Sequence, residues 1–201
     1  PVELSLENLS LKMPGTHQME NAAAAVTAFL LLQKDDSDRS PIRNGLLQSF
    51  MPLRCEIVSR EDFPTIIFDG AHNRSSMQAF VKTVSEMFPH RQLLLIFGAS
   101  LGKDVEGMFA EIEGQFSHVF LTQSSQSSRR FPPQELRLLL SLSDTHVSTV
   151  ENCKDAWEQC MQRAGSTDVI CVTGSLYLAA ELRQLHRKDS ILSPPPLGGG
   201  E

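Results

Sequence analysis

The sequence predicts an α/β protein with a Rossmann-like, mainly parallel sheet of about six strands and helices on both faces, preceded by a short helical segment. After residue 52, short runs of Val, Ile, Leu and Phe alternate with stretches of helical pattern. Such apolar runs are typical of parallel strands buried on both faces. Before residue 52, the chain shows only helical patterns. With 201 residues, 41% of them hydrophobic, it can bury one good core.

The elements are expected in the following order. Residues 18–33 have a helical pattern that ends at the polar segment KDDSDRS, and Ser40-Pro41 supplies a cap and a first-turn proline for a helix through residue 50. Strands are expected at 55–60, 65–70, 92–98, 118–123, 146–150 and 168–174, with helices at 75–87, 105–115, 133–142, 153–164 and 176–187. The Pro- and Gly-rich tail at 191–201 is expected to be disordered.

Composition excludes several classes of protein. The net charge of −6 and the absence of a basic run argue against a nucleic-acid-binding platform. The apolar run at 21–32 is too short and too rich in Ala to span a membrane, and it lacks the basic flank of a signal peptide. The four cysteines form no CxxC pair, so reduced core thiols are expected. We therefore expect a cytoplasmic protein, and a monomer.

Polar residues follow three of the predicted strands. Asp69 and His72 come directly after one strand, Lys103 follows the next, and Ser175 follows the last, each strand end being marked by a glycine. Right-handed crossovers place the carboxyl ends of parallel strands at one edge of the sheet, where ligands bind near helix N-termini. Together these strand ends predict a site for a small anionic ligand.

Each residue also has an ordinary structural interpretation. Asp69 or Asn73 could cap the next helix, and Ser175 could cap the last one. Lys103 could be a surface lysine, and His72 a turn residue. Four other histidines have no partner pattern and are expected at the surface: residues 90, 118, 146 and 186.

The order of the motifs resembles a known family. GTHQMENAAAAVTAF, LRCEIV, IIFDGAHN, IFGASLGKD and VTGSLYLAAELR resemble folylpolyglutamate synthase/dihydrofolate synthase, ATP-dependent amide-forming ligases of the Mur ligase superfamily. The resemblance covers residues 13 to about 187. The TGSLYL and HQxxNAA patterns disfavour a different amino-acid ligase of the superfamily.

The resemblance also implies a division of the chain. Family members begin with an ATPase domain that contains a phosphate-binding loop, and no GxxxxGK[ST] pattern occurs here. Residues 1–40 are thus expected to be the end of the ATPase domain and a linker. Residues 41–190 are expected to be the Mur ligase C-terminal (glutamate ligase) domain, followed by the tail at 191–201. The chain alone is then expected to be inactive, with the ATPase domain as its partner in cis.

The family mechanism implies a role for each site residue. ATP phosphorylates the carboxylate of dihydropteroate or of a folate glutamate tail, and the amine of L-glutamate attacks the acyl phosphate. The motif positions imply ATP contacts from Asn21, Arg54 and Asp69, and glutamate contacts from His72, Lys103 and Ser175. Mg²⁺ accompanies ATP, but no metal ligand is expected in this chain.

The sequence departs from the family pattern near Arg54. Pro52-Leu53-Arg54 has leucine where the family has glycine, which leaves the geometry of the turn open. Arg129, before a predicted helix, is expected on the nucleotide side. The alternative function is an isolated, non-catalytic α/β module for ligand binding or interaction. The sequence does not separate dihydrofolate synthase from folylpolyglutamate synthase.

Overall fold

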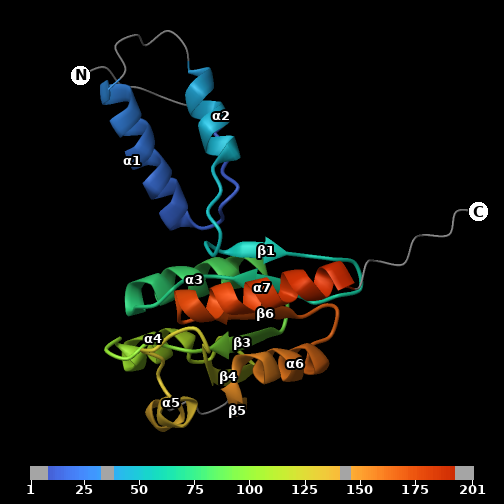
Figure 1. Cartoon of the computed structure of the whole chain (residues 1–201). Helices are drawn as coiled ribbons and strands as arrows, with labels where there is room; N and C mark the ends of the chain where they lie inside the picture. The colour runs from blue at the N-terminus through green and yellow to red at the C-terminus, as the bar shows by residue number, and fades with distance from the viewer. Residues whose placement is uncertain (1–8, 33–38, 141–145, 193–201) are drawn as a thin grey trace, which may run out of the picture.

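The computed structural model describes residues 9–32, 39–140 and 146–192, and shows a six-stranded sheet between two layers of helices (Figure 1). The strands lie in the order β1-β2-β6-β3-β4-β5, with β1 antiparallel to β2 and the other pairs parallel. Their bounds are β1 Glu56–Val58, β2 Thr65–Phe68, β3 Leu93–Phe97, β4 His118–Gln123, β5 His146–Asn152 and β6 Val169–Thr173. The predicted α/β fold class and all six strands are confirmed.

Seven helices are described: α1 Thr16–Leu32, α2 Ser40–Gln48, α3 Arg74–Met87, α4 Val105–Ile112, α5 Pro133–Leu139, α6 Cys153–Arg163 and α7 Leu176–Leu192. The predicted end of α4 at residue 115 is wrong, because Gly114 adopts a φ of 70° in the turn that follows the helix. The last helix runs past its predicted end and includes the first two residues of the predicted tail. The rest of that tail, 193–201, lies outside the described residues.

Side chains alternate between the two faces of the sheet, which explains the continuous apolar strands. Ile67, Leu95 and Cys171 belong to a core cluster shared with α3, α4 and α5. Ile66 and Ile170 belong to a second cluster shared with α6 and α7. The strands therefore lie between two cores, as buried parallel strands require.

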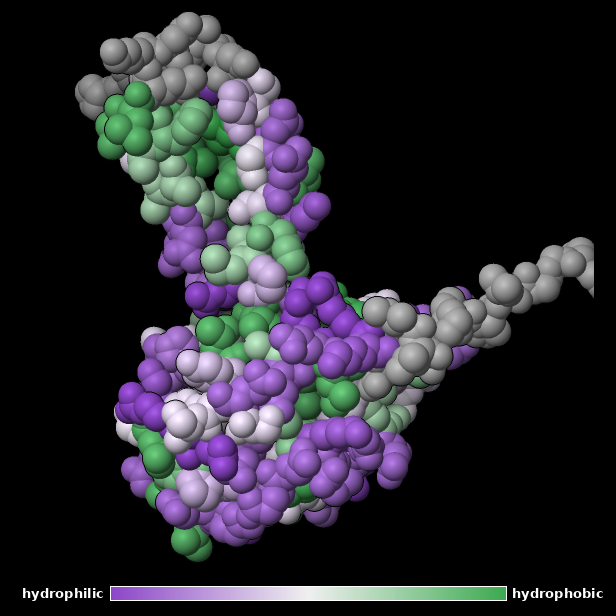
Figure 2. All heavy atoms as spheres, viewed as in Figure 1, coloured by the Kyte–Doolittle hydropathy of each residue, from purple (hydrophilic) through white to green (hydrophobic). Residues whose placement is uncertain are grey.

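The two N-terminal helices project from the sheet (Figure 1). Gln18 is the buried residue of α1, whereas Leu31 and Leu32 are 82% and 84% exposed. Figure 2 shows a hydrophobic surface over α1. Figure 1 also shows α2 beside α1 rather than on the sheet, and the domain boundary at residue 40 stays a prediction. Among the described residues, no helix is long and apolar enough to cross a membrane.

The four cysteines are free and buried, as expected for reduced core thiols: Cys55, Cys153, Cys160 and Cys171. Burial raises the pKa of each thiol, to about 12 for Cys153 and Cys160. A thiol with a raised pKa holds little reactive thiolate at neutral pH. These cysteines are therefore packing residues.

Candidate functional site

The carboxyl ends of β2, β6, β3 and β4 pack against one another at one edge of the sheet. A Cβ on Gly70 would lie 2.8 Å from Leu176 Cδ1, one on Gly174 would lie 2.7 Å from the Gly98 oxygen, and one on Gly98 would lie 2.6 Å from the Thr122 oxygen. Only glycine allows such close approaches. The helices that follow β2 and β3, α3 and α4, cover one face of the sheet, whereas α7, which follows β6, covers the other. The chain therefore switches faces on both sides of β6, between β2 and β6 and between β6 and β3. Ligands of open α/β sheets bind at such points.

Asp69 ties the end of β2 to the turn before β1. Its Oδ2 accepts a hydrogen bond from the Cys55 amide at 2.8 Å, and its Oδ1 accepts one from the Ala71 amide at 2.7 Å. Burial raises the pKa of Asp69, and this rise is opposed by the two amides and by the charges of Arg54 and His17. The carboxylate thus has a clear structural role, and its predicted contact with ATP stays a prediction.

Arg54 stands on a constrained turn between Leu53 and Cys55, which have φ values of 60° and 48°. The Leu53 carbonyl accepts a hydrogen bond from the Gly70 amide at 2.8 Å, and the Leu53 amide donates to Glu56 Oε2 at 3.2 Å. Leucine therefore occupies the left-handed conformation that glycine favours. The turn presents the exposed Arg54 side chain close enough to Asp69 to affect its pKa.

His72 and Asn73 have different roles in the loop after β2. Asn73 caps α3, where its side chain accepts a hydrogen bond from the Ser76 amide at 2.9 Å and Ser76 Oγ completes a capping box. His72 is exposed, and its Nδ1 lies 2.9 Å from the Gly70 carbonyl oxygen. That carbonyl can only accept, so Nδ1–H donates, and in the neutral ring Nε2 is left as an acceptor.

Ser175 lies at the switch from β6 to α7. It is 5% exposed, and its carbonyl accepts the first helical hydrogen bond, from the Ala179 amide at 3.0 Å. It is thus the N-cap residue by position. The preceding Gly174 has a φ of 95°, which allows the sharp turn into the helix. The first amides of α7 therefore begin at the strand end nearest Gly98.

Lys103 and Arg129 lie on two adjoining loops. The Leu101 amide donates to the Arg129 carbonyl at 2.8 Å, and Arg129 Nη2 donates to the Leu101 carbonyl at 3.2 Å. Lys103 is exposed and follows Leu101 by two residues. The structure thus groups Arg129 with Lys103 rather than with the residues predicted to contact ATP.

Asn21 lies on α1, whose start packs on α3. Its Nδ2 donates to Gln18 Oε1 at 3.3 Å, and Gln18 Nε2 lies 3.1 Å from His17 Nε2. His17 is near enough to Asp69 to lower the pKa of that carboxyl, against the effect of burial. The start of α1 therefore lies on the same side of the molecule as the loop after β2.

Sequence reasoning missed Glu181, on α7. Its carboxylate accepts hydrogen bonds from Ser124 Oγ at 2.7 Å and from the Ser125 amide at 2.9 Å. Its position was a usable signal, because Glu181 stands next to Leu182 and three residues after Leu178, on the apolar face of the helix. A carboxylate placed there has to find donors.

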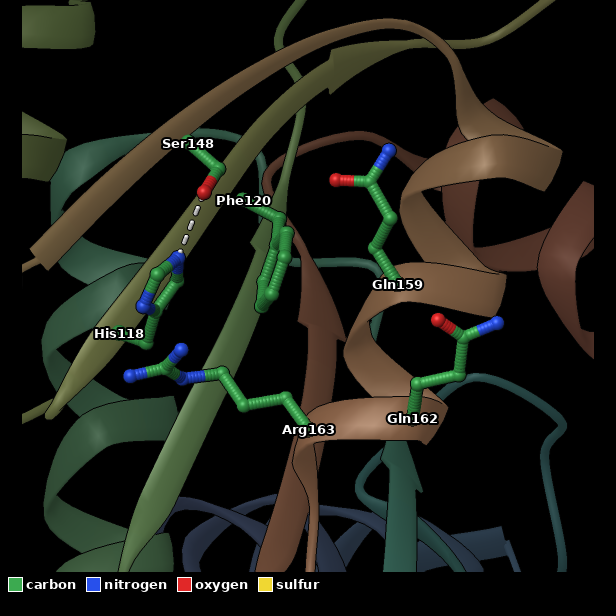
Figure 3. A pocket seen from close by; sticks show the side chains of 6 residues that line it. All are labelled: His118, Phe120, Ser148, Gln159, Gln162 and Arg163. Carbon is green, nitrogen blue, oxygen red and sulfur yellow. Dashed lines mark hydrogen bonds between the residues drawn. The ribbon is translucent and has the colours of Figure 1, made fainter.

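A hollow of about 340 Å³ lies at the opposite edge of the sheet, where β4 begins (Figure 3). Its lining residues are His118, Phe120, Ser148, Gln159, Gln162 and Arg163. The expectation of a surface histidine is wrong for His118, which is 7% exposed and has Nε2 2.8 Å from Ser148 Oγ. Burial, Arg163 and His146 lower the pKa of His118 to about 4. The hollow is separate from the candidate site.

A second histidine also differs from expectation. His186 is half-buried, with its ring centroid 6.0 Å from that of Phe68 and 5.7 Å from that of Trp157. His90 and His146 are exposed, as expected. The two histidines are shielded from solvent for the same reason: a side chain from an element distant in sequence covers the ring in each case.

No group of three or more His, Cys, Asp or Glu side chains among the described residues could hold a metal ion. What the described strand ends offer is exposed cations, amides and hydroxyls, a set suited to anionic groups.

The comparisons with known proteins agree with this architecture. The family described as "Mur ligase, glutamate ligase domain" matches residues 53–176. The chain belongs to this family. The match covers the sheet from the turn before β1 to the start of α7, and so includes all the strand ends described above.

Similar proteins include folylpolyglutamate and dihydrofolate synthases. The chain is 27% identical over 186 residues to the dihydrofolate synthase/folylpolyglutamate synthase of Bacillus subtilis, covering 90% of this chain and 42% of the relative. It is 30% identical to the folylpolyglutamate synthase of Lacticaseibacillus casei, covering 89% of this chain and 40% of that protein. The chain thus spans less than half of these relatives. The expected resemblance to folylpolyglutamate synthase/dihydrofolate synthase is confirmed.

Solved structures show the same fold. Mycobacterium tuberculosis folylpolyglutamate synthase complexed with ADP is 28% identical and superposes with a TM-score of 0.76, over 88% of this chain and 41% of that chain. E. coli FolC in complex with DHPP and ADP is 24% identical and superposes with a TM-score of 0.79, over 94% of this chain and 42% of that chain. At that identity the second likeness concerns the fold alone.

Proposed function

We propose that this chain is the C-terminal part of an ATP-dependent ligase that adds L-glutamate to dihydropteroate or folate through an acyl phosphate. The observation that carries the proposal is the convergence of the loops after β2, β6 and β3 at one edge of the sheet. These loops bring His72, Ser175 and Lys103 to a single edge in a chain of the glutamate ligase domain family. The ADP complex of Mycobacterium tuberculosis folylpolyglutamate synthase, a related protein, supports a nucleotide as one of the ligands.

The proposal divides the edge between two ligands. Asn21, Arg54 and Asp69 belong to the side near the start of α1 and serve ATP, with Arg54 as the phosphate-binding fork. His72, Lys103 and Ser175 serve L-glutamate: Lys103 and Ser175 supply a cation and donors for its carboxylates, and Nε2 of His72 accepts a hydrogen bond from its amino group. Mg²⁺ bound with ATP would take its protein ligands from outside the described residues.

The projecting helices fit a contact with a further domain. Leu31 and Leu32 on α1, and Phe50 and Met51 after α2, are each more than half exposed. Large apolar side chains left exposed along one projecting segment favour an interaction surface there. We assign this surface to an ATPase domain joined in cis, in a monomeric, cytoplasmic enzyme that binds neither nucleic acid nor membrane.

Kinetics of the ligase that carries this chain test the division. Ser175→Ala and His72→Ala should raise the KM for L-glutamate by about tenfold and that for ATP far less, since a lost hydrogen bond to a charged group costs about 1.5–3 kcal/mol. Arg54→Ala should show the reverse. The matched control is Asn73→Ala, which removes a helix cap worth about 1 kcal/mol of stability and should leave both KM values unchanged.

Two results would contradict the proposal. A lower melting temperature of Ser175→Ala with an unchanged KM for L-glutamate would reduce Ser175 to a cap. Phosphate release by this chain alone, with folate, L-glutamate and MgATP, would contradict the assignment of phosphoryl transfer to another domain. If the KM values for L-glutamate and for ATP stay at their wild-type values in Ser175→Ala, His72→Ala and Arg54→Ala, the alternative of a non-catalytic binding module gains support.

A further inference from the structure

Glu181 is the most heavily hydrogen-bonded carboxylate near the candidate site among the described residues. Its Oε2 accepts from Ser124 Oγ at 2.7 Å and from the Ser125 amide at 2.9 Å, while its Oε1 accepts from Ser125 Oγ. The Cys153 thiol is a further donor. Glu181 lies on α7, six residues after Ser175, so it links the loop after β4 to the helix that begins at the site.

The far end of the same loop is tied to the loop after β3. The Leu101 amide donates to the Arg129 carbonyl at 2.8 Å, and the Phe131 amide donates to the Ala99 carbonyl at 2.9 Å. An antiparallel bridge joins Ser100 to the residue between these two. Residues 124–131 therefore form a strap that runs from Glu181 on α7 to the segment that leads into Lys103.

We propose that Glu181 is a positioning residue of the candidate site, which anchors the strap and thereby fixes the β3–α4 segment that carries Lys103 relative to Ser175. The positioning role rests on the proposed function for the ligand, and the anchor itself rests on the hydrogen bonds alone. Without the anchor, the strap loses its fixed distance from α7, and the backbone hydrogen bonds that join it to the β3–α4 loop open more often.

Only a carboxylate satisfies this set of donors. Glutamine has the same length, but its amide nitrogen donates and cannot accept from Ser124 or Ser125. Hydrogen bonds to an ionised acceptor are also the stronger ones. Glu181→Gln therefore removes the charge and at least one hydrogen bond. It weakens the acceptor for the hydroxyl of Ser124, which is only 4% exposed.

Amide hydrogen exchange on the ¹⁵N-labelled chain tests the anchor. In Glu181→Gln, the Leu101 and Phe131 amides should exchange about tenfold faster, whereas the Val169 amide, bonded to the Gln92 carbonyl at the opposite edge, should be unchanged. The matched control is Glu158→Gln, which removes the same charge from an exposed α6 pair 3.9 Å from Lys154. It should leave all three amides unaffected.

Titration with L-glutamate tests the positioning role. The shift of the Lys103 amide should report an affinity about fivefold weaker in Glu181→Gln than in the Glu158→Gln control. If Glu181 had a purely structural role, Glu181→Gln would lower the melting temperature, but at equal folded fraction the two variants would bind L-glutamate with the same affinity. Should Glu181→Gln fail to fold, the double variant Ser124→Ala, Ser125→Ala removes the donors instead and should give the same exchange pattern.

Two failures are distinguishable. If the wild-type chain shows no response to L-glutamate, the proposed function of this edge is overturned, and the positioning role with it. If the wild type responds, but Glu181→Gln matches its control in exchange and in affinity, only the role of Glu181 is overturned.

Discussion

At the scale of single residues, the turn that holds Arg54 shows how a costly conformation is maintained. Leu53 and Cys55 both have positive φ, where the side chain of an L-residue meets its own backbone. Three hydrogen bonds, from Gly70, Cys55 and Leu53 itself, hold the backbone there. Leu53 is also 8% exposed, so its burial offsets part of the cost.

The first prediction compares two truncations of Leu53. Both Leu53→Ala and Leu53→Gly lose the buried side chain, but only glycine relieves the left-handed strain of about 1 kcal/mol. The glycine variant should therefore be the more stable, by about 1 kcal/mol in urea unfolding.

The control for this comparison is Leu94, a buried residue of β3 whose φ is not positive. There the order should be the usual one, with alanine more stable than glycine by about 0.5–1 kcal/mol. Equal stability of the two Leu53 variants would show that the turn is unstrained.

The second prediction concerns the pH dependence given by His118. Its pKa falls from 6.5 to about 4 in the folded protein, because burial and the nearby Arg163 disfavour the charged ring. Between these values the unfolded chain binds more protons than the folded chain. The contribution of His118 to the free energy of unfolding is therefore complete above pH 6.5 and is lost as the pH falls toward 4. In His118→Gln the melting temperature should fall less over this range.

The exposed His90 gives the control for the same measurement. His90→Gln should retain the wild-type dependence of the melting temperature on pH, since solvent surrounds the ring. A wild-type slope in His118→Gln as well would mean that the buried ring does not contribute to acid sensitivity.

The burial of His118 was beyond sequence reasoning, whereas the positions of Asp69 and Ser175 at strand ends were not. Asp69 and Ser175 follow apolar runs that can only be buried strands, and parallel strands share one carboxyl edge. His118 is covered by Ser148 and Arg163, which come from elements whose position depends on the whole fold. Local pattern carries no information about such partners.

At the scale of elements, the short strand β1 is fastened to α7 by a partly buried ion pair. Glu56 Oε2 lies 2.6 Å from Arg183 Nε, with side chains 10% and 14% exposed. The same oxygen accepts from the Leu53 amide at 3.2 Å. One carboxylate therefore joins the antiparallel edge of the sheet, the turn with Arg54 and the last helix.

The third prediction is that Glu56→Ala costs about 2 kcal/mol of unfolding free energy, because it leaves the partly buried Arg183 guanidinium without its carboxylate partner. Urea unfolding measures the loss. The surface pair of Lys82 and Glu86, 3.9 Å apart and more than half exposed, is the control, and Glu86→Ala should cost less than about 0.5 kcal/mol. Similar costs at both positions would show that the pair on β1 is effectively solvated.

The ends of elements were less predictable than their existence. Strands β2, β3, β4 and β6 match because each contains a continuous apolar run, but α4 ends early and α7 ends late. Gly114 stops α4 only because its backbone turns there to a positive φ. The apolar residues of α7 indicate the buried face of the helix and not its length.

At the scale of the whole molecule, the two-core sheet and the projecting helices behave differently. The sheet carries both hydrophobic clusters, whereas α1 buries little of its apolar sequence. Composition alone could not tell these helices apart from core helices. An apolar helix indicates that it packs against something, but not whether that surface belongs to the same domain.

The fourth prediction is that Leu31→Lys with Leu32→Lys leaves the stability of the chain within about 0.5 kcal/mol, because both side chains are already more than 80% exposed. Urea unfolding of the double variant checks this. In the complete ligase the same change should lower the turnover rate, and a Lys12→Leu variant gives a control of similar size at the N-terminal segment. Loss of stability in the isolated chain would mean that α1 packs there.

The central strand of the sheet is also the last to be synthesised. β6 pairs with both β2 and β3, which do not touch each other, so the ribosome releases both neighbours long before the strand that joins them. Until residue 173 has emerged, a nascent chain holds two incomplete sheets, each with an open edge able to pair with another polypeptide. Completion depends on contacts distant in sequence, which form slowly. The growing chain therefore needs protection from aggregation from the emergence of β2 until β6 has been made.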